Sequence, residues 1–308
     1  MKKAIVVGGA GFVGSAVVIE LLARSIDVTV IVRPGFDPTK NQRLNNLRVN
    51  IIECDIANIL EVPKLLPERD FDVWYQFAWD GLFNEPLMDY TVQTNNIKYV
   101  MDAVVVARAL GCKKFVGAGS ITQYELRTLE GQTNINDKHR VYKTAKLACE
   151  YMGRSVASRE EIEFYWPIIT NIFGEGEESP RLINSMIKKL LAGDHQKLSE
   201  GNQIYDFIYI SDAARAFADI GQCGMEHRTY VIGSGGAKPL KEFLSELRDI
   251  VAPEAELGFG DLTYSGVYLQ ADDYSINALR EDTGFEPQVP FADGVRRTMN
   301  WIVNRNIL

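Results

Sequence analysis

Apolar residues recur at two different spacings along the first half of the chain. Short continuous apolar runs predict buried strands at 4–7, 28–32, 49–53, 73–77, 114–117 and 163–166. Apolar residues at helical spacing predict helices over 12–22, 87–110 and 141–158. Strands and helices that alternate in this way are typical of a doubly wound parallel sheet with right-handed crossovers.

The pattern changes after Pro167, where turn residues cluster at 174–180. Shorter segments follow: a helix with Lys188 and Lys189, a strand at 204–210, a helix at 212–220, a segment at 239–251, a β-like stretch at 266–270, and helices near 275–283 and 291–304. We expect a dinucleotide-binding domain over 1–167. Residues 168–308 are expected to form mainly a smaller mixed α/β substrate-binding lobe, with some segments returning to the first domain.

Three glycines lie between the first predicted strand and the first predicted helix. Gly8 permits a tight turn, Gly11 lets the backbone approach a pyrophosphate, and Gly14 lets helix and strand pack closely. The free N–H groups at the helix start, near Phe12 and Val13, suit an anion. This strand–turn–helix context favours a Rossmann-type dinucleotide site over a glycine turn without a ligand.

Composition narrows the class of protein. The net charge of −8 argues against nucleic-acid binding, because no domain-wide basic surface is available to neutralise phosphates. No apolar run is long enough to span a bilayer, and 4–7 is too short for a signal peptide. The four cysteines and three histidines show no metal-binding spacing. We therefore expect a cytoplasmic protein with reduced thiols, without a metal and without a membrane partner.

The end of the second predicted strand bears on the choice of dinucleotide. An acidic residue there would bind a ribose 2′-hydroxyl, whereas an arginine suits a 2′-phosphate. Val32 and Arg33 hold these positions and neither is acidic, which favours NADP(H) and leaves NAD(H) possible. Asp55, after the third strand, is either close to the adenine ring or a helix cap.

The most specific chemical signal is the pair Tyr142 and Lys146. Residues four apart share one face of a helix, and an ammonium near a phenol is expected to lower the tyrosine pKa. Tyr142 is then a usable proton donor or acceptor. Ser120, at the end of the fifth strand, is placed to donate to a substrate carbonyl oxygen.

With these residues the chain resembles the extended short-chain dehydrogenase/reductases, the family of nucleotide-sugar epimerases, dehydratases and ketoreductases. The resemblance covers nearly the whole chain and rests on the glycine turn, Asp55, 77–79, Ser120, Tyr142, Lys146, Pro167, Asn171, Gly174 and 206–212. It implies that Tyr142 is the general acid/base, that Lys146 holds the nicotinamide ribose and tunes Tyr142, and that Ser120 polarises the carbonyl.

The strand ends and the resemblance together propose two sets of binding residues. Cofactor contacts are expected from Gly8, Gly11, Phe12, Val13, Gly14, Arg33, Asp55, Ile56, Phe77, Ala78, Trp79, Tyr142, Lys146 and Pro167. Substrate contacts are expected from Trp79, Asp80, Thr122, Asn171, Arg181 and Tyr205. Trp79 is alternatively a core residue, Asn171 a turn residue and Arg181 part of a solvated helix face. Tyr205 stands where the family often has a phosphate-binding arginine.

Departures from the family pattern narrow the expected reaction. The 4,6-dehydratases carry an acidic pair directly after the catalytic hydroxyl residue, where this chain has Ile121 and Thr122. Thr122 also replaces the cysteine of the 3,5-epimerase/reductases. Simple hydride transfer at a carbonyl or 4-epimerisation remains. The resemblance is nearest to reductases that make nucleotide-linked deoxyhexoses, such as CDP-abequose synthase.

The expected function is therefore the NADPH-dependent reduction of a nucleotide-linked 4-keto-6-deoxyhexose at C4, with Tyr142 as proton donor. The alternatives are a nucleotide-sugar 4-epimerase with tightly bound NAD and a non-catalytic dinucleotide-sensing protein. The intact set of Ser120, Tyr142 and Lys146 argues against sensing alone. The equivalent of the helices at 87–110 and 141–158 pairs across a dimer in this family, so we expect a homodimer through a four-helix bundle.

Overall fold

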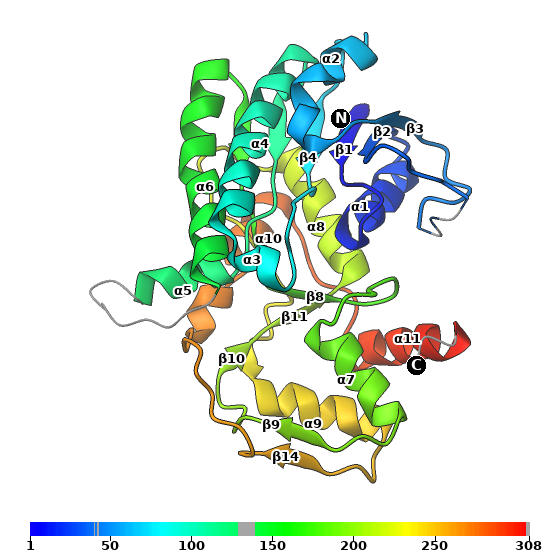
Figure 1. The fold of residues 1–308 in the computed structure, drawn as a ribbon, viewed down its shortest axis with the longest axis vertical. Coiled ribbons are helices and arrows are strands. Elements are labelled where there is room, and N and C mark those ends of the chain that lie inside the picture. Colours follow the sequence, from blue (N-terminus) through cyan, green and yellow to red (C-terminus); the bar gives the residue numbers. More distant parts are fainter. Residues whose placement is uncertain (40, 42, 129–138, 306–308) are drawn as a thin grey trace.

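A six-stranded parallel sheet forms the centre of the N-terminal half (Figure 1). The computed structural model describes residues 1–39, 41, 43–128 and 139–305. In chain order the strands are β1 (Lys3–Val7), β2 (Asp27–Val32), β3 (Asn50–Glu53), β4 (Val73–Gln76), β5 (Lys114–Val116) and β6 (Glu163–Tyr165). Their spatial order, β3-β2-β1-β4-β5-β6, is that of a doubly wound Rossmann sheet, which confirms the predicted fold class.

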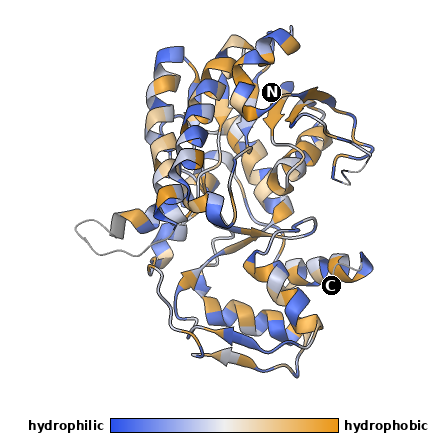
Figure 2. Cartoon of the chain, in the orientation of Figure 1, coloured by the Kyte–Doolittle hydropathy of each residue, from blue (hydrophilic) through white to orange (hydrophobic). Residues whose placement is uncertain are grey.

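The apolar run of β1 explains its central place. Ala4 to Val7 are almost completely buried, and Ala4 pairs with Val28 of β2 on one side and Val73 of β4 on the other. Because β1 is covered on both faces and paired on both edges, water reaches none of these side chains. A continuous apolar run suits such a strand. Figure 2 shows this hydrophobic colouring along the inner strands, whereas the surrounding helices are mixed.

Helices cover both faces of the sheet. They are α1 (Phe12–Ala23), η1 (Ile56–Glu61), α2 (Val62–Leu65), α3 (Glu85–Met88), α4 (Tyr90–Ala109), α5 (Thr122–Thr128), α6 (Arg140–Glu160) and α8 (Ile210–Cys223). α1 packs against α8 on one face, and α4 packs against α6 on the other. None of the described helices combines the length and apolar character that a membrane crossing requires.

The helix predicted over 87–110 is interrupted. α3 ends at Met88, and α4 begins again at Tyr90 with Asp89 as its N-cap. The Asp89 carboxylate accepts hydrogen bonds from the backbone nitrogens of Thr91 and Val92 at 2.7 and 3.3 Å. An aspartate that caps a helix in this way satisfies N–H groups that otherwise lack a partner, so it favours a new start over continuation.

The C-terminal part forms the smaller lobe below the sheet (Figure 1). Its strands are β7 (Ile168–Ile169), β8 (Asn171–Phe173), β9 (Gln196–Leu198), β10 (Ile204–Tyr205), β11 (Phe207–Tyr209), β12 (Val231–Ile232), β13 (Lys238–Pro239) and β14 (Leu257–Phe259). The helices of this part of the chain are α7 (Leu182–Leu191), α9 (Leu240–Val251), η2 (Ala271–Tyr274), α10 (Asn277–Thr283) and α11 (Phe291–Asn304). Of these, α10 does not lie in the lobe but packs against α8 on the body. The boundary between the domains at residue 167 stays a prediction.

Two predicted elements of the lobe are wrong, and a third begins later than expected. The strand predicted over 204–210 is two strands, because β10 pairs with β13 whereas β11 pairs with β8. The change of partner occurs at Asp206, whose buried carboxylate accepts a hydrogen bond of 2.7 Å from the Ser234 nitrogen. The β-like stretch over 266–270 forms no strand; it is an irregular segment that leads into η2 at Ala271. The helix expected over 275–283 begins only at Asn277.

Candidate active site

The glycine turn lies where β1 meets α1, and its spacing is enforced by close contacts. Gly8 has a φ of 79°, which favours glycine, and a Cβ there would lie 2.7 Å from the Ala78 nitrogen. A Cβ at Gly14 would lie 2.3 Å from the Gly8 carbonyl oxygen. Gly11, by contrast, is exposed, and a Cβ there would meet only the Gly8 carbonyl oxygen, at 3.3 Å. The turn therefore packs tightly on the protein side and stays accessible on the outer side.

The start of α1 fits the phosphates of a dinucleotide. Gly11 is the N-cap in an extended conformation, and no side chain caps the helix. The half-buried Phe12 and Val13 open the first turn, whose N–H groups point out of the helix start. An uncapped N-terminus beside an open glycine is a suitable cradle for an anion.

The residues after β4 form the next side of this groove. The nitrogens of Phe77 and Ala78 donate to the Val7 carbonyl oxygen at 2.9 and 3.1 Å, so this segment crosses directly over the end of β1. The buried Pro167 lies on the far side and accepts a hydrogen bond of 2.9 Å from the Gly119 nitrogen. Backbone hydrogen bonds thus join the end of β4 to that of β1, and the segment after β5 to that after β6, along the expected dinucleotide groove.

Two predicted cofactor residues have protein partners in this structure. Asp55 caps η1, and its carboxylate accepts a hydrogen bond of 2.9 Å from the Ala57 nitrogen. Asp55 is therefore a helix cap, with Ile56 buried behind it, and its contact with an adenine ring stays a prediction. Arg33 extends from the end of β2 to the Asp80 carboxylate at 2.9 Å, and both side chains are exposed.

Three hydroxyls gather where the sequence places the catalytic group. The Ser120 and Thr122 hydroxyl oxygens are 2.9 Å apart, and the Ser120 side chain is close enough to the Tyr142 phenol to act on its pKa. The Ser120 nitrogen donates to the buried Gln123 side chain at 2.9 Å, which fixes the turn between β5 and α5. The structure therefore brings Ser120 and Tyr142 to one place, and their catalytic roles stay predictions.

Lys146 lies behind the hydroxyls, on the same face of α6 as Tyr142. Its ammonium nitrogen donates to the Ala118 carbonyl oxygen at 2.9 Å and lies 3.5 Å from the centroid of the Trp79 ring. Burial lowers the pKa of Lys146 to about 7; the nearby Cys149 opposes this shift and Arg181 adds to it. Lys146 is thus a buried amine whose pKa lies close to neutral pH.

The expectation that Lys146 lowers the pKa of Tyr142 is wrong for the free protein. Burial raises the pKa of Tyr142 above 10.0, because the phenolate would lose its hydration. The groups that oppose this shift are the Arg181 guanidinium and the Ser120 hydroxyl. Sequence spacing identified the helix face correctly, but it contained no information on how strongly that face is desolvated.

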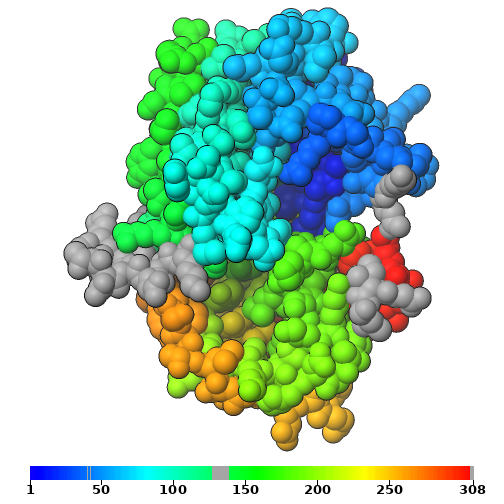
Figure 3. Space-filling model, viewed as in Figure 1, coloured from blue at the N-terminus to red at the C-terminus, as the bar shows by residue number. Residues whose placement is uncertain are grey.

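A cavity of about 1080 Å³ opens at the hydroxyl cluster, between the body and the lobe. Figure 3 shows a hollow in this region, between the cyan segment above and the green and orange segments below. Its wall includes Ser120, Thr122, Tyr142, His139, Asn171, Arg181 and Tyr205. The predicted substrate residues Trp79 and Asp80 do not line it. Trp79 is buried under Lys146, and Asp80 pairs with Arg33.

The lobe side of the cavity carries the groups expected to meet a phosphate. Asn171 opens β8 and its side chain donates to the Asp206 carbonyl oxygen at 3.0 Å. Arg181 is the N-cap of α7, and its guanidinium lies 3.3 Å from the buried Glu177 carboxylate. Tyr205 completes this wall. On the lobe side of the cavity, Arg181 therefore supplies a positive charge, whereas Tyr205 supplies none.

Sequence reasoning missed a charged pair in the same cavity. Lys143 on α6 and Glu125 on α5 form an ion pair, and both line the cavity. Their side chains are 7% and 19% exposed, so the pair is largely removed from water. The available signal was the position of Lys143 directly after Tyr142, which puts it at the same end of α6.

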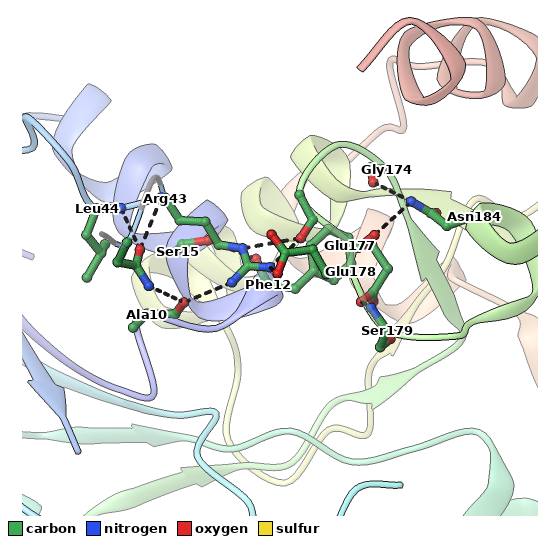
Figure 4. A network of polar contacts seen from close by, with 12 residues as sticks. Ala10, Phe12, Ser15, Arg43, Leu44, Gly174, Glu177, Glu178, Ser179 and Asn184 are labelled. Carbon is green, nitrogen blue, oxygen red and sulfur yellow. Dashed lines mark hydrogen bonds and ion pairs between the residues drawn. The ribbon is translucent and has the colours of Figure 1, made fainter. Parts of the chain in front are cut away.

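A second network joins the glycine turn to the lobe (Figure 4). The Arg43 guanidinium donates to the Ala10 carbonyl oxygen at 3.4 Å and to the Gly176 carbonyl oxygen at 2.5 Å. The buried Asn184 donates to the Gly174 carbonyl oxygen at 3.2 Å and so braces the same loop. A larger cavity of about 1230 Å³ adjoins this network, but the hydroxyl cluster is not part of its wall.

A family model described as the NAD dependent epimerase/dehydratase family matches residues 4–233. The chain belongs to this family. Membership confirms the resemblance seen in the sequence and makes the chain an enzyme of the epimerase/dehydratase type.

Relatives within the family carry several activities. A putative UDP-glucose 4-epimerase of Methanocaldococcus jannaschii is 24% identical over 98% of this chain and 99% of its own length. CDP-abequose synthase of Salmonella typhimurium is 24% identical over 97% of this chain and 98% of its own. The enzyme WbmF of Bordetella bronchiseptica, solved in complex with NADH, superposes with a TM-score of 0.79 at 20% identity, covering 99% and 93% of the two chains. The likeness to WbmF shows that the two chains share one fold.

Proposed function

We propose that this protein reduces a nucleotide-linked 4-keto-6-deoxyhexose to the 6-deoxyhexose, with NADPH as reductant. The observation that carries the proposal is the hydroxyl cluster of Ser120, Thr122 and Tyr142 on the wall of the 1080 Å³ cavity. A carbonyl oxygen gains negative charge as it is reduced, and hydroxyl donors at the oxygen stabilise that charge. The cluster supplies such donors beside a cavity large enough for a sugar nucleotide.

Each residue of the cluster has a distinct proposed role. A reduced nicotinamide supplies a hydride when it is bound. Tyr142 remains protonated at neutral pH because burial raises its pKa, so it has a proton to give to the alkoxide oxygen. Ser120 and Thr122 hold the oxygen by hydrogen bonds, and Lys146 holds a ribose of the cofactor.

The lobe side supports a nucleotide diphosphate on the substrate. The guanidinium of Arg181 faces the cavity at the start of α7, where the helix dipole also favours an anion. Glu177 holds this guanidinium, and Asn171 supplies a side-chain amide nearby. Arg181 would therefore replace the arginine that the family often has at the position of Tyr205.

The cofactor proposal is NADP(H), held by Arg33 at the end of β2, with Gly8, Gly11 and Gly14 at the diphosphate. To bind the 2′-phosphate, the Arg33 guanidinium must leave its ion pair with the Asp80 carboxylate. An exposed ion pair contributes little, about 0–1 kcal/mol, so a dianionic phosphate can displace the carboxylate. Relatives bind NAD or NADH, and NAD(H) is the alternative.

A nucleotide-sugar 4-epimerase is the second candidate, because relatives with that name align over the whole chain. The two reactions differ in their need for reductant. The epimerase would carry tightly held NAD and interconvert its sugars without added NADPH, whereas the reductase would consume NADPH with each turnover. The acidic pair of the dehydratases is absent next to Ser120, which disfavours the elimination of water.

A panel of nucleotide-linked 4-keto-6-deoxyhexoses, assayed by NADPH oxidation at 340 nm, tests the proposal. Wild-type protein should oxidise NADPH with at least one of them, and Tyr142→Phe should lower kcat by roughly 10²–10⁴-fold. Tyr151→Phe, on the exposed face of the same helix, is the matched control and should retain full activity. Turnover of UDP-hexoses without added reductant would instead identify the epimerase.

A further inference from the structure

The surroundings of Lys146 contain a feature that the proposed roles of Ser120, Tyr142 and Lys146 do not use. Three aromatic rings surround its ammonium nitrogen. The distances from Nζ to the ring centroids are 3.5 Å for Trp79, 5.6 Å for Trp166 and 5.8 Å for Tyr142. Cations within about 6 Å of a ring face are attracted by its negative quadrupole. The Trp79 contact is the shortest of the three and therefore the strongest.

The aromatic faces matter because no carboxylate of the described residues forms an ion pair with Lys146. The ammonium is buried, and it donates a hydrogen bond to the Ala118 carbonyl oxygen. The charged or titratable groups that affect it are Cys149 and Arg181, and the Tyr142 phenol faces it from its own helix. Burial favours the neutral amine, so the ring faces and the Ala118 carbonyl oxygen are the neutral groups that favour the charged form.

Trp79 is fixed in place by residues that are far away in the sequence. Its indole nitrogen donates to the Gln93 side-chain oxygen at 3.0 Å. Gln93, which is 1% exposed, in turn donates to the carbonyl oxygens of Gly81 and Pro86 at 3.1 and 3.0 Å. The Trp79 ring also packs edge-on against Tyr142, with centroids 5.9 Å apart. The indole therefore has one orientation, with its face toward Lys146.

We propose that Trp79 is a positioning residue whose indole face holds Lys146 charged and in place at the catalytic wall. The inference rests on the proposed function for the role of Lys146 in cofactor binding. Trp79 then contacts no sugar, and its role goes beyond filling the hydrophobic core. Without the ring, Lys146 would lose its proton at lower pH and bind the ribose less well.

The test measures cofactor affinity against pH and needs no sugar substrate. NADPH and NADH are titrated by nicotinamide fluorescence between about pH 6 and 10. The affinity should fall above a midpoint set by Lys146, and Lys146→Met should abolish that midpoint. Trp79→Leu should move the midpoint about 1 unit lower, which weakens binding by roughly 5-fold at the pH of the wild-type midpoint and by roughly 10-fold well above it. Trp79→Phe keeps an aromatic face and should give an intermediate midpoint.

Trp301→Leu is the matched control, because Trp301 lies on α11 and its ring contacts Arg305 instead. Its midpoint should equal that of the wild type. A wild-type midpoint in Trp79→Leu, or in Trp79→Phe if the leucine variant does not fold, would overturn the proposal. If wild-type protein reduces no 4-keto sugar, the proposed function fails while the midpoint shift still decides the role of Trp79.

Discussion

Arg33 and Asp80 form an ion pair across the expected adenosine end of the cofactor groove, with 2.9 Å between nitrogen and oxygen. Arg33 comes from the end of β2 and Asp80 from the segment after β4, which are separated by β1 in the sheet. Both side chains are exposed, at 75% and 41%, so the pair is screened by water. The Asp80 carboxylate is therefore paired with the Arg33 guanidinium that a 2′-phosphate would need.

Cofactor preference should therefore respond in opposite directions to two substitutions. Arg33→Ala should weaken NADPH binding by roughly 10-fold or more, whereas Asp80→Asn should strengthen it several-fold by removing the competing carboxylate. NADH binding should change little in both. Fluorescence titration with each cofactor measures the ratio. Lys64→Ala, which breaks the exposed pair with Glu61, is the control. A clear NADH preference that Arg33→Ala leaves unaltered would contradict the assignment.

The Lys143–Glu125 pair should show strong coupling. Removal of one partner leaves a poorly hydrated charge, which typically costs about 3–5 kcal/mol for a fully buried pair. We expect Lys143→Met and Glu125→Gln each to lower the free energy of unfolding of the wild type strongly. The second substitution, added to either single variant, should lower it much less. Urea unfolding of the four proteins gives this double-mutant cycle. Additive effects would mean that the two charges act independently of each other.

Lys146 should give the free protein a stability that rises with pH. Its pKa is about 7 in the folded chain, below the 10.5 of the unfolded chain. Between these values the unfolded chain binds more protons, so the free energy of unfolding rises by up to roughly 1.4 kcal/mol per pH unit. Above pH 9 the buried thiol of Cys149 opposes this rise, because burial raises its pKa from 9.0 to about 12.

Urea unfolding at a series of pH values should thus show a rise in stability from pH 7 to about pH 9 and a flattening or decline beyond it. Lys146→Met should remove the rising limb, and Cys149→Ala should extend it. Lys189→Met, at an exposed position of α7, should leave the profile unchanged. A rise that persists in Lys146→Met would assign it to another group.

The outer face of α6 predicts self-association. Tyr151 and Met152 are 68% and 49% exposed there, on the helix that packs against α4. We expect a homodimer in which α4 and α6 of two copies form a four-helix bundle, because apolar side chains on a helix face are buried by a partner helix. Light scattering at micromolar concentration should give twice the mass of 34.6 kDa. Tyr151→Glu should yield the monomer, whereas Leu262→Glu in the lobe should not. A monomeric wild type would contradict the expectation.

Local patterns predicted the Rossmann half of the protein well. The apolar runs over 4–7 and 28–32 coincide with β1 and β2, because strands buried on both faces need such runs. Where capping or pairing partners decide the structure, the pattern was misleading. Asp89 interrupts a continuous helical pattern, and Asp206 divides a continuous strand pattern between two sheets.

The candidate site shows the same division between sequence and structure. Ser120, Tyr142 and Lys146 were recognisable, because their spacing follows from one strand end and one helix face. Trp79 under Lys146, Asp80 on Arg33 and the pair of Lys143 with Glu125 were not. These contacts join residues from different strands and helices, so no local pattern contains them.

The sequence by itself determined most of the order of strands and helices, the glycine turn and the residue types of the candidate catalytic group. Each of these depends on neighbours within one or two turns of the chain. Only the tertiary structure decided how strongly each group is desolvated and which charge it meets. Burial raises the pKa of Tyr142 and lowers that of Lys146 because the packed body and lobe exclude water from both. That exclusion is a property of the assembled fold.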